Sequence, residues 1–66
     1  MTTIEEARQN ALERAGKADN ARLLDLYAVA SKRYWNALMD NRSQDYIDKT
    51  YERLEVFREE LLKRLG

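Results

Sequence analysis

The sequence predicts an all-α protein: an antiparallel hairpin of two long helices, at about residues 20–39 and 44–65, preceded by a short helix at about 3–15. Apolar residues recur every three or four positions in each segment, polar interruptions separate the segments, and proline is absent. Sixty-six residues are enough for one domain, 1–66, near the size at which folding buries only about 60% of the unfolded surface. Both a three-helix bundle and a dimeric bundle therefore fit the pattern.

The first helix is expected to begin at Thr2 or Thr3, whose hydroxyl can accept from free backbone N–H groups. A glutamate follows three residues after either threonine, at the capping-box position. The core-facing side consists mostly of small residues, namely Ile4, Ala7, Ala11 and Ala15. Gly16 fits a C-terminal cap, and Asp19 or Asn20 fits the N-cap of the next helix. We therefore expect a weakly buried helix that breaks near Gly16.

The second helix carries an apolar arc of about 220°, wider than one neighbouring helix can cover. Its main stripe comprises Leu23, Leu26, Tyr27, Ala30, Tyr34, Ala37 and Leu38. Beside that stripe runs a second strip made of Leu24, Ala28, Trp35 and Met39, called the α2 strip below. The sequence therefore predicts that this helix is central and is contacted on two sides.

A polar turn at residues 40–43 is expected to separate the two long helices. Asn41 tolerates the left-handed conformation that ends helices, and Ser43 can cap the helix that follows. So short a turn predicts antiparallel packing. The third helix presents one apolar face, made of Tyr46, Ile47, Thr50, Leu54, Phe57, Leu61 and Leu65, with Tyr51 and Leu62 at its edge. Val56 is predicted to point away from it, alone.

Composition excludes several classes of chemistry. Without His or Cys, and with two Gly, the chain cannot build a His-based triad, a thiol site, a Cys/His zinc site or a phosphate-cradling loop. We expect no enzymatic activity, no cofactor and no metal. No stretch approaches the roughly 18 apolar residues of a membrane span, and the N-terminus lacks a signal-peptide pattern. We therefore expect a cytoplasmic protein without a membrane partner.

The α2 strip is the strongest candidate for a binding surface, because Trp and Met are enriched at the cores of protein interfaces. Two explanations fit it: the first helix covers the strip, or a second copy or a partner protein does. The alanines of the first helix are small for filling space opposite Trp35 and Met39. The predicted function is a non-enzymatic protein–protein interaction module that uses this strip to self-associate, as a homodimer, or to bind another protein, and that regulates or assembles a larger complex.

A stripe of acidic residues on the third helix is a second candidate surface. Spacings of three and four place its members within about 80° of arc: Asp45, Asp48, Glu52, Glu55 and Glu59. The stripe fits a solvated face with ordinary i, i+4 pairs such as Asp45 with Lys49. It also fits a docking face for a basic partner, which would relieve the repulsion between Asp48 and Glu52 and between Glu55 and Glu59.

A small nucleic-acid-binding regulator is the alternative function. Lys32, Arg33, Tyr34 and Trp35 combine cations with aromatic rings, which nucleic-acid sites use. Helical geometry separates them, because Tyr34 falls on the main apolar stripe while the two cations fall on the polar side. Twelve Lys plus Arg balance twelve Asp plus Glu, and the balance holds within each segment. Nucleic acid is therefore disfavoured as a partner.

Overall fold

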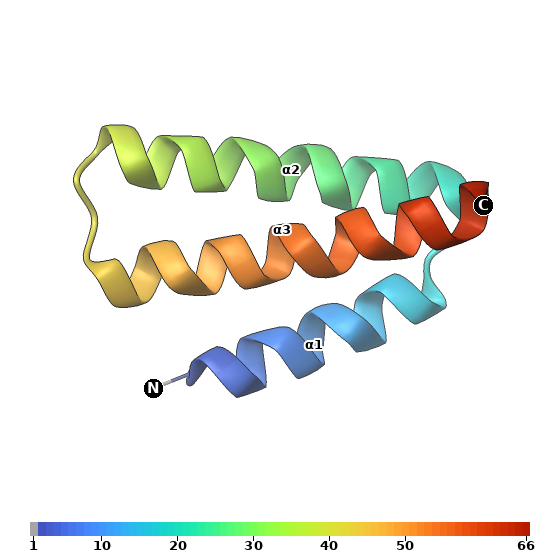
Figure 1. The fold of residues 1–66 in the computed structure, drawn as a ribbon, viewed down its shortest axis with the longest axis horizontal. Helices are drawn as coiled ribbons and strands as arrows, with labels where there is room; N and C mark the ends of the chain where they lie inside the picture. The colour runs from blue at the N-terminus through green and yellow to red at the C-terminus, as the bar shows by residue number, and fades with distance from the viewer. Residues whose placement is uncertain (1) are drawn as a thin grey trace.

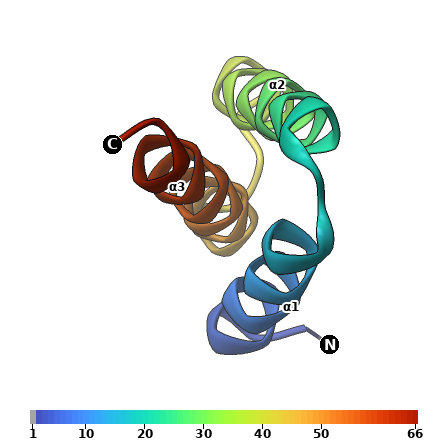
Figure 2. The ribbon, with the colours of Figure 1, turned by 90° about the vertical axis from the view of Figure 1, so that its right-hand side faces the viewer.

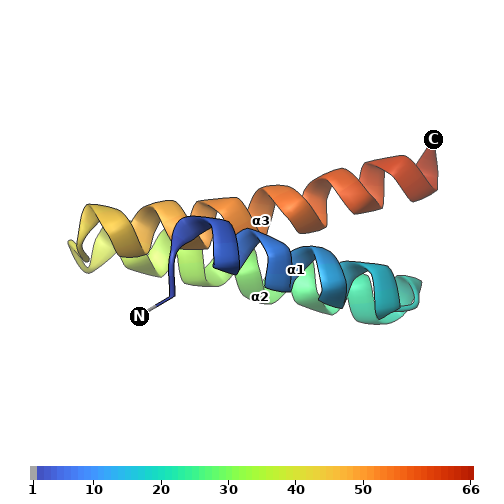
Figure 3. The same ribbon diagram turned by 90° about the horizontal axis from the view of Figure 1, so that it is seen from below.

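The computed structural model describes residues 2–66, which fold into three α-helices (Figure 1). α1 spans Ile4–Lys17, α2 spans Asn20–Met39 and α3 spans Gln44–Leu65. The all-α class and the bounds of the two long helices are confirmed, and the described residues form a three-helix bundle without strands. All three helices run along the long axis of a body of 34 × 22 × 17 Å (Figures 1 and 3). Within residues 2–66, none of the helices combines the length and apolar character that a membrane span needs.

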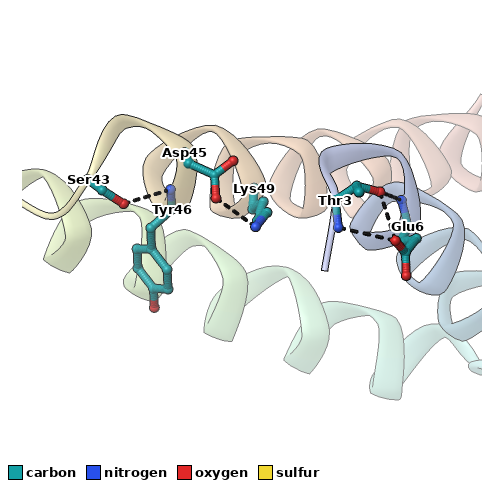
Figure 4. A network of polar contacts seen from close by, with 6 residues as sticks. All are labelled: Thr3, Glu6, Ser43, Asp45, Tyr46 and Lys49. Atoms are coloured by element: carbon teal, nitrogen blue, oxygen red, sulfur yellow. Dashed lines mark hydrogen bonds and ion pairs between the residues drawn. The ribbon is translucent and has the colours of Figure 1, made fainter. Parts of the chain in front are cut away.

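α1 begins with the predicted capping box, at Thr3. The backbone N–H of Glu6 donates to the Thr3 hydroxyl at 3.1 Å, and the Glu6 carboxylate accepts from the Thr3 backbone N–H at 3.4 Å (Figure 4). Two of the free N–H groups at the helix start are thereby satisfied. α2 begins in a related way, because the Asp19 carboxylate accepts from the backbone N–H of Arg22 at 2.8 Å.

The prediction that Gly16 caps α1 is wrong, although the predicted break between the first two helices is confirmed. α1 continues through Gly16 to Lys17 and ends at Ala18, whose backbone is extended at φ −81° and ψ 140°. At this end the backbone N–H of Ala18 donates to the Arg14 carbonyl at 3.1 Å and to the Ala15 carbonyl at 3.4 Å. The Arg64 guanidinium of α3 adds hydrogen bonds to the Ala15 carbonyl and to the Asn20 side chain, each at 3.0 Å. Arg64 therefore binds the last turn of α1 and the first residue of α2. The end of α1 does not require a glycine.

The turn between α2 and α3 forms as predicted. Asn41 adopts φ 53°, in the left-handed region. The backbone N–H of Arg42 then donates to the Ala37 carbonyl at 3.1 Å, and that of Asn41 to the Leu38 carbonyl at 3.4 Å, which is the Schellman arrangement. Ser43 caps α3 by accepting from the backbone N–H of Tyr46 at 3.3 Å (Figure 4). The connection is short enough to hold α2 and α3 side by side.

α3, and not α2, is the central helix, so the predicted centrality of the second helix is wrong. α3 packs against both α2 and α1, whereas α1 and α2 touch each other only weakly. Viewed end-on, the other two helices flank α3 on two sides (Figure 2). Val56 and Phe57, which point about 100° apart on a helix, are both buried, at 6% and 2% exposure. The prediction that Val56 stands alone is therefore also wrong.

Small residues on α1 explain how it covers α3. Ala7, Ala11 and Ala15 are almost fully buried, which lets the α1 backbone approach closely. One core cluster joins all three helices and contains Ala11, Ala15, Leu23, Leu26, Ala30, Val56 and Phe57. Thr50 is the one polar side chain in the buried set of described residues, and its hydroxyl donates to the Ile47 carbonyl at 2.7 Å. Leu65, predicted on the core face, is 82% exposed at the helix end.

Candidate protein-interaction face

The α2 strip is exposed along its whole length. Leu24 is 57% exposed, Trp35 61% and Met39 80%, and Ala28 is exposed as well. The explanation in which the first helix covers this strip is wrong, because α1 packs on α3 instead. An apolar strip with a Trp at its centre is therefore left facing solvent in the single chain.

Two tyrosines extend the α2 strip towards α3. The ring of Tyr34 lies 5.8 Å from that of Trp35 in an edge arrangement, and 5.5 Å from that of Tyr51 on α3. Offset and edge-on aromatic pairs at such distances stabilise each other by about 0.5–1.5 kcal/mol. Trp35, Tyr34 and Tyr51 therefore form a continuous aromatic row across the α2–α3 seam.

The sequence pattern predicts Tyr34 in the main apolar stripe of α2 and Tyr51 at the edge of the apolar face of α3, and does not join them to Trp35. The antiparallel pairing of the two long helices is enough to predict that Tyr34 and Tyr51 lie close together. Tyr34 lies six residues before the turn that begins at Asp40, and Tyr51 lies eight residues after Ser43, so the two stand at similar levels. Residues at similar distances from a tight turn face each other in a helical hairpin.

Further apolar residues share the side of the hairpin that the aromatic row marks. Helical periodicity places Leu24 and Leu38 within about 60° of Trp35 on α2, and Leu62 within about 20° of Tyr51 on α3. Leu38 is 38% exposed and Leu62 53%. We call this surface the aromatic face and define it as the α2 strip together with Tyr34, Leu38, Tyr51 and Leu62.

One charged pair lies at the rim of the aromatic face. The Arg58 guanidinium is 3.5 Å from the Glu55 carboxylate. The negative charge of Glu55 also raises the pKa of the Tyr51 phenol above its ordinary value, with a smaller contribution from burial. The phenol of Tyr51 suits a place at the edge of an apolar contact, because its ring can be covered while its hydroxyl stays in water.

The acidic stripe of α3 lies beside α1 and is partly paired within the chain. Lys49 reaches the Asp45 carboxylate at 2.7 Å, as predicted, and the Arg8 guanidinium of α1 lies 3.9 Å from Glu52 (Figure 4 shows the first pair). Asp48 accepts from the side-chain amide of Gln44 at 2.8 Å. Docking of a basic partner on this stripe stays a prediction.

An open trough runs between the acidic stripe and α1. It encloses about 900 Å³ of space that is continuous with solvent, and its lining residues are Ile4, Glu5, Arg8, Tyr51, Glu52, Glu55, Val56 and Glu59. In the part of the chain that the structure describes, no three carboxylates are placed to hold a metal ion. The trough thus offers negative charge without a coordination site.

Comparisons of the chain with protein-family models, with curated proteins and with solved structures find no match.

Proposed function

We propose that this protein is a non-enzymatic interaction module that self-associates through its aromatic face, and that the resulting assembly regulates or helps to build a larger complex. The observation that carries the proposal is the exposure of Trp35 beside the Tyr34–Tyr51 pair. A Trp that is 61% exposed among apolar neighbours leaves a large apolar area in water. Trp and Tyr are also the residues that most often dominate binding energy at interfaces.

The size of the aromatic face supports an interface. A large side chain presents roughly 150–250 Å² when fully exposed. We multiply this area by the exposed fraction of each large residue of the aromatic face. The exposed area is then roughly 650 Å² per chain, summed over Leu24, Trp35, Leu38, Met39, Tyr51 and Leu62. The largest apolar patch on a typical monomer covers about 300–600 Å². Two copies would bury roughly 1,300 Å², above the roughly 1,000 Å² expected of a specific interface.

Self-association also fits the size of the chain. A domain of 66 residues has a small core. Among the described residues, Leu23 is the one large side chain that is fully buried. A second copy on the aromatic face would extend the apolar interior across α2 and α3. A two-fold arrangement uses the same face on both copies and closes without further growth. The proposal keeps the expected cytoplasmic location, which cell fractionation tests.

Sedimentation equilibrium tests the proposal. The wild-type chain should form dimers at tens of micromolar, and Trp35→Glu should be monomeric because it places a charge at the centre of the face. Leu12→Glu is the matched control: Leu12 is 43% exposed on α1, away from the aromatic face, and its variant should dimerise normally. A monomeric wild type, or equal effects of the two variants, would contradict the proposal.

A further inference from the structure

A groove between α1 and α2, with α3 as its floor, gathers cations from all three helices. Its first hollow is lined by Arg14, Leu26, Val29, Ala30, Arg33, Thr50, Arg53 and Phe57. A second hollow continues it towards the α1–α2 connection and is lined by Arg14, Lys17, Ala18, Arg22 and Leu26. Arg14 and Leu26 line both, so the two hollows adjoin each other. We call this surface the basic groove; neither lining contains an acidic residue.

The cations of the basic groove lack acidic partners within the described chain. Among residues 2–66, ion pairs are made by other cations, namely Arg8, Lys49, Arg58 and Arg64. The glutamates next to α1 instead line the trough on its other side. The chain is neutral overall, yet folding places positive charge on one side of α1 and negative charge on the other. Clustered cations without counter-charges attract an anionic ligand.

The floor of the basic groove is apolar and shallow. Phe57 and Leu26 are buried, and the Arg14 guanidinium lies 5.9 Å above the Phe57 ring, where its stem covers the floor. Val29 is 48% exposed at the side of the hollow. The cavity volume of about 20 Å³ in the first hollow has room for one or two water-sized groups. The first hollow therefore admits the tip of one aliphatic side chain.

We propose that the basic groove binds an acidic segment of a partner protein. Carboxylates of the segment pair with Arg14, Arg33 and Arg53, since guanidinium groups bind carboxylates through two parallel hydrogen bonds. One aliphatic side chain of the segment packs on Val29 and enters the hollow. The groove shares no residue with the aromatic face, so this binding is independent of self-association.

The structure favours an acidic peptide over a nucleic acid. Single-stranded nucleic acids bind through cationic grooves that also present aromatic rings for base stacking. The aromatic ring in the groove lining is that of Phe57, which is 2% exposed and covered by Arg14. Trp35 and Tyr51, which are exposed, belong to the aromatic face. The cations of the groove could bind phosphates, but its lining has no exposed aromatic ring on which a base could stack.

Fluorescence anisotropy with labelled probes tests the inference at low and at physiological salt. The probes are a peptide of repeated Glu-Glu-Leu units, the same peptide with Ser in place of Leu, and an oligothymidylate of equal net charge. The test variant is Arg33→Gln with Arg53→Gln. Its matched control is Lys32→Gln with Lys63→Gln, which removes the same charge outside the groove linings. Circular dichroism and sedimentation should show that both variants fold and self-associate normally.

The Glu-Glu-Leu peptide should bind more tightly than the Glu-Glu-Ser peptide, and more tightly than the oligothymidylate. The groove variant should weaken its binding by about two- to thirtyfold, the range that two exposed ion pairs supply, and the control by less than about twofold. Val29→Asp should abolish the preference for Leu over Ser. Equal losses in the two double variants would overturn the inference, as would an oligothymidylate that binds at least as tightly as the peptide.

Discussion

Replacing Phe57 with alanine tests whether this residue of α3 lies in the core that the three helices share. Phe57 is 2% exposed and belongs to the core cluster that joins α1, α2 and α3. Truncating so buried a ring removes its transfer free energy and leaves a cavity, which costs about 3–5 kcal/mol. A chain of 66 residues has a total stability of roughly 3–10 kcal/mol. Phe57→Ala should therefore bring the protein close to its unfolding threshold.

Urea denaturation followed by circular dichroism measures the loss, at one fixed protein concentration because self-association adds to stability. Ile4→Ala is the comparison: Ile4 is 39% exposed at the start of α1, so its truncation should cost about 1–2 kcal/mol. Phe57→Leu, which keeps most of the volume, gives a measurable intermediate if Phe57→Ala fails to fold. Equal losses at Phe57 and Ile4 would refute the reasoning that Phe57 lies in the shared core and Ile4 at its edge.

Three further predictions concern single contacts. Asn41→Ala should lower the free energy of unfolding by about 1–2 kcal/mol, since alanine is strained at φ 53°, whereas Asn41→Gly should not; thermal denaturation compares them. Arg64→Met should cost about 1–3 kcal/mol and speed amide exchange around the α1–α2 connection, because it removes the side-chain hydrogen bonds to the Ala15 carbonyl and to Asn20. The raised pKa of Tyr51 means that the folded chain favours the neutral phenol. Its contribution to stability is present below the ordinary tyrosine pKa and is lost as pH rises through the raised value. Ultraviolet titration should show that Glu55→Gln lowers the pKa of Tyr51.

Much of the fold follows from local sequence. The bounds of α2 and α3 agree with the structure because their caps, at Asp19, Asn41 and Ser43, act within a few residues of the helix ends. The prediction failed at Gly16: α1 continues to Lys17, and a distant residue, Arg64, adds a hydrogen bond to the Ala15 carbonyl near its end. A contact across 49 positions leaves no local pattern.

The arrangement of the helices could not be predicted from apolar periodicity alone. The wide apolar arc of α2 predicted two neighbours, but part of that arc is the exposed aromatic face. The second buried face of α3 has Val56 as its one large apolar residue, and acidic residues lie on either side of it. The alanines of α1 cover this face. Similarly, each helix contributes one or two cations to the basic groove. Acidic residues in the same segment balance them, so the net charge of each segment is close to zero. The positive and negative charges are separated only when the helices pack together.

Fluorescence of Trp35, the single Trp in the chain, tests the central claim most directly. The indole is 61% exposed in one chain and would be covered in the proposed assembly. Emission should shift to the blue, and quenching by acrylamide should fall, as protein concentration rises from nanomolar to tens of micromolar. The Leu12→Glu variant should show the same shift. Emission and quenching that stay constant over that range would mean that the aromatic face does not bind a second copy.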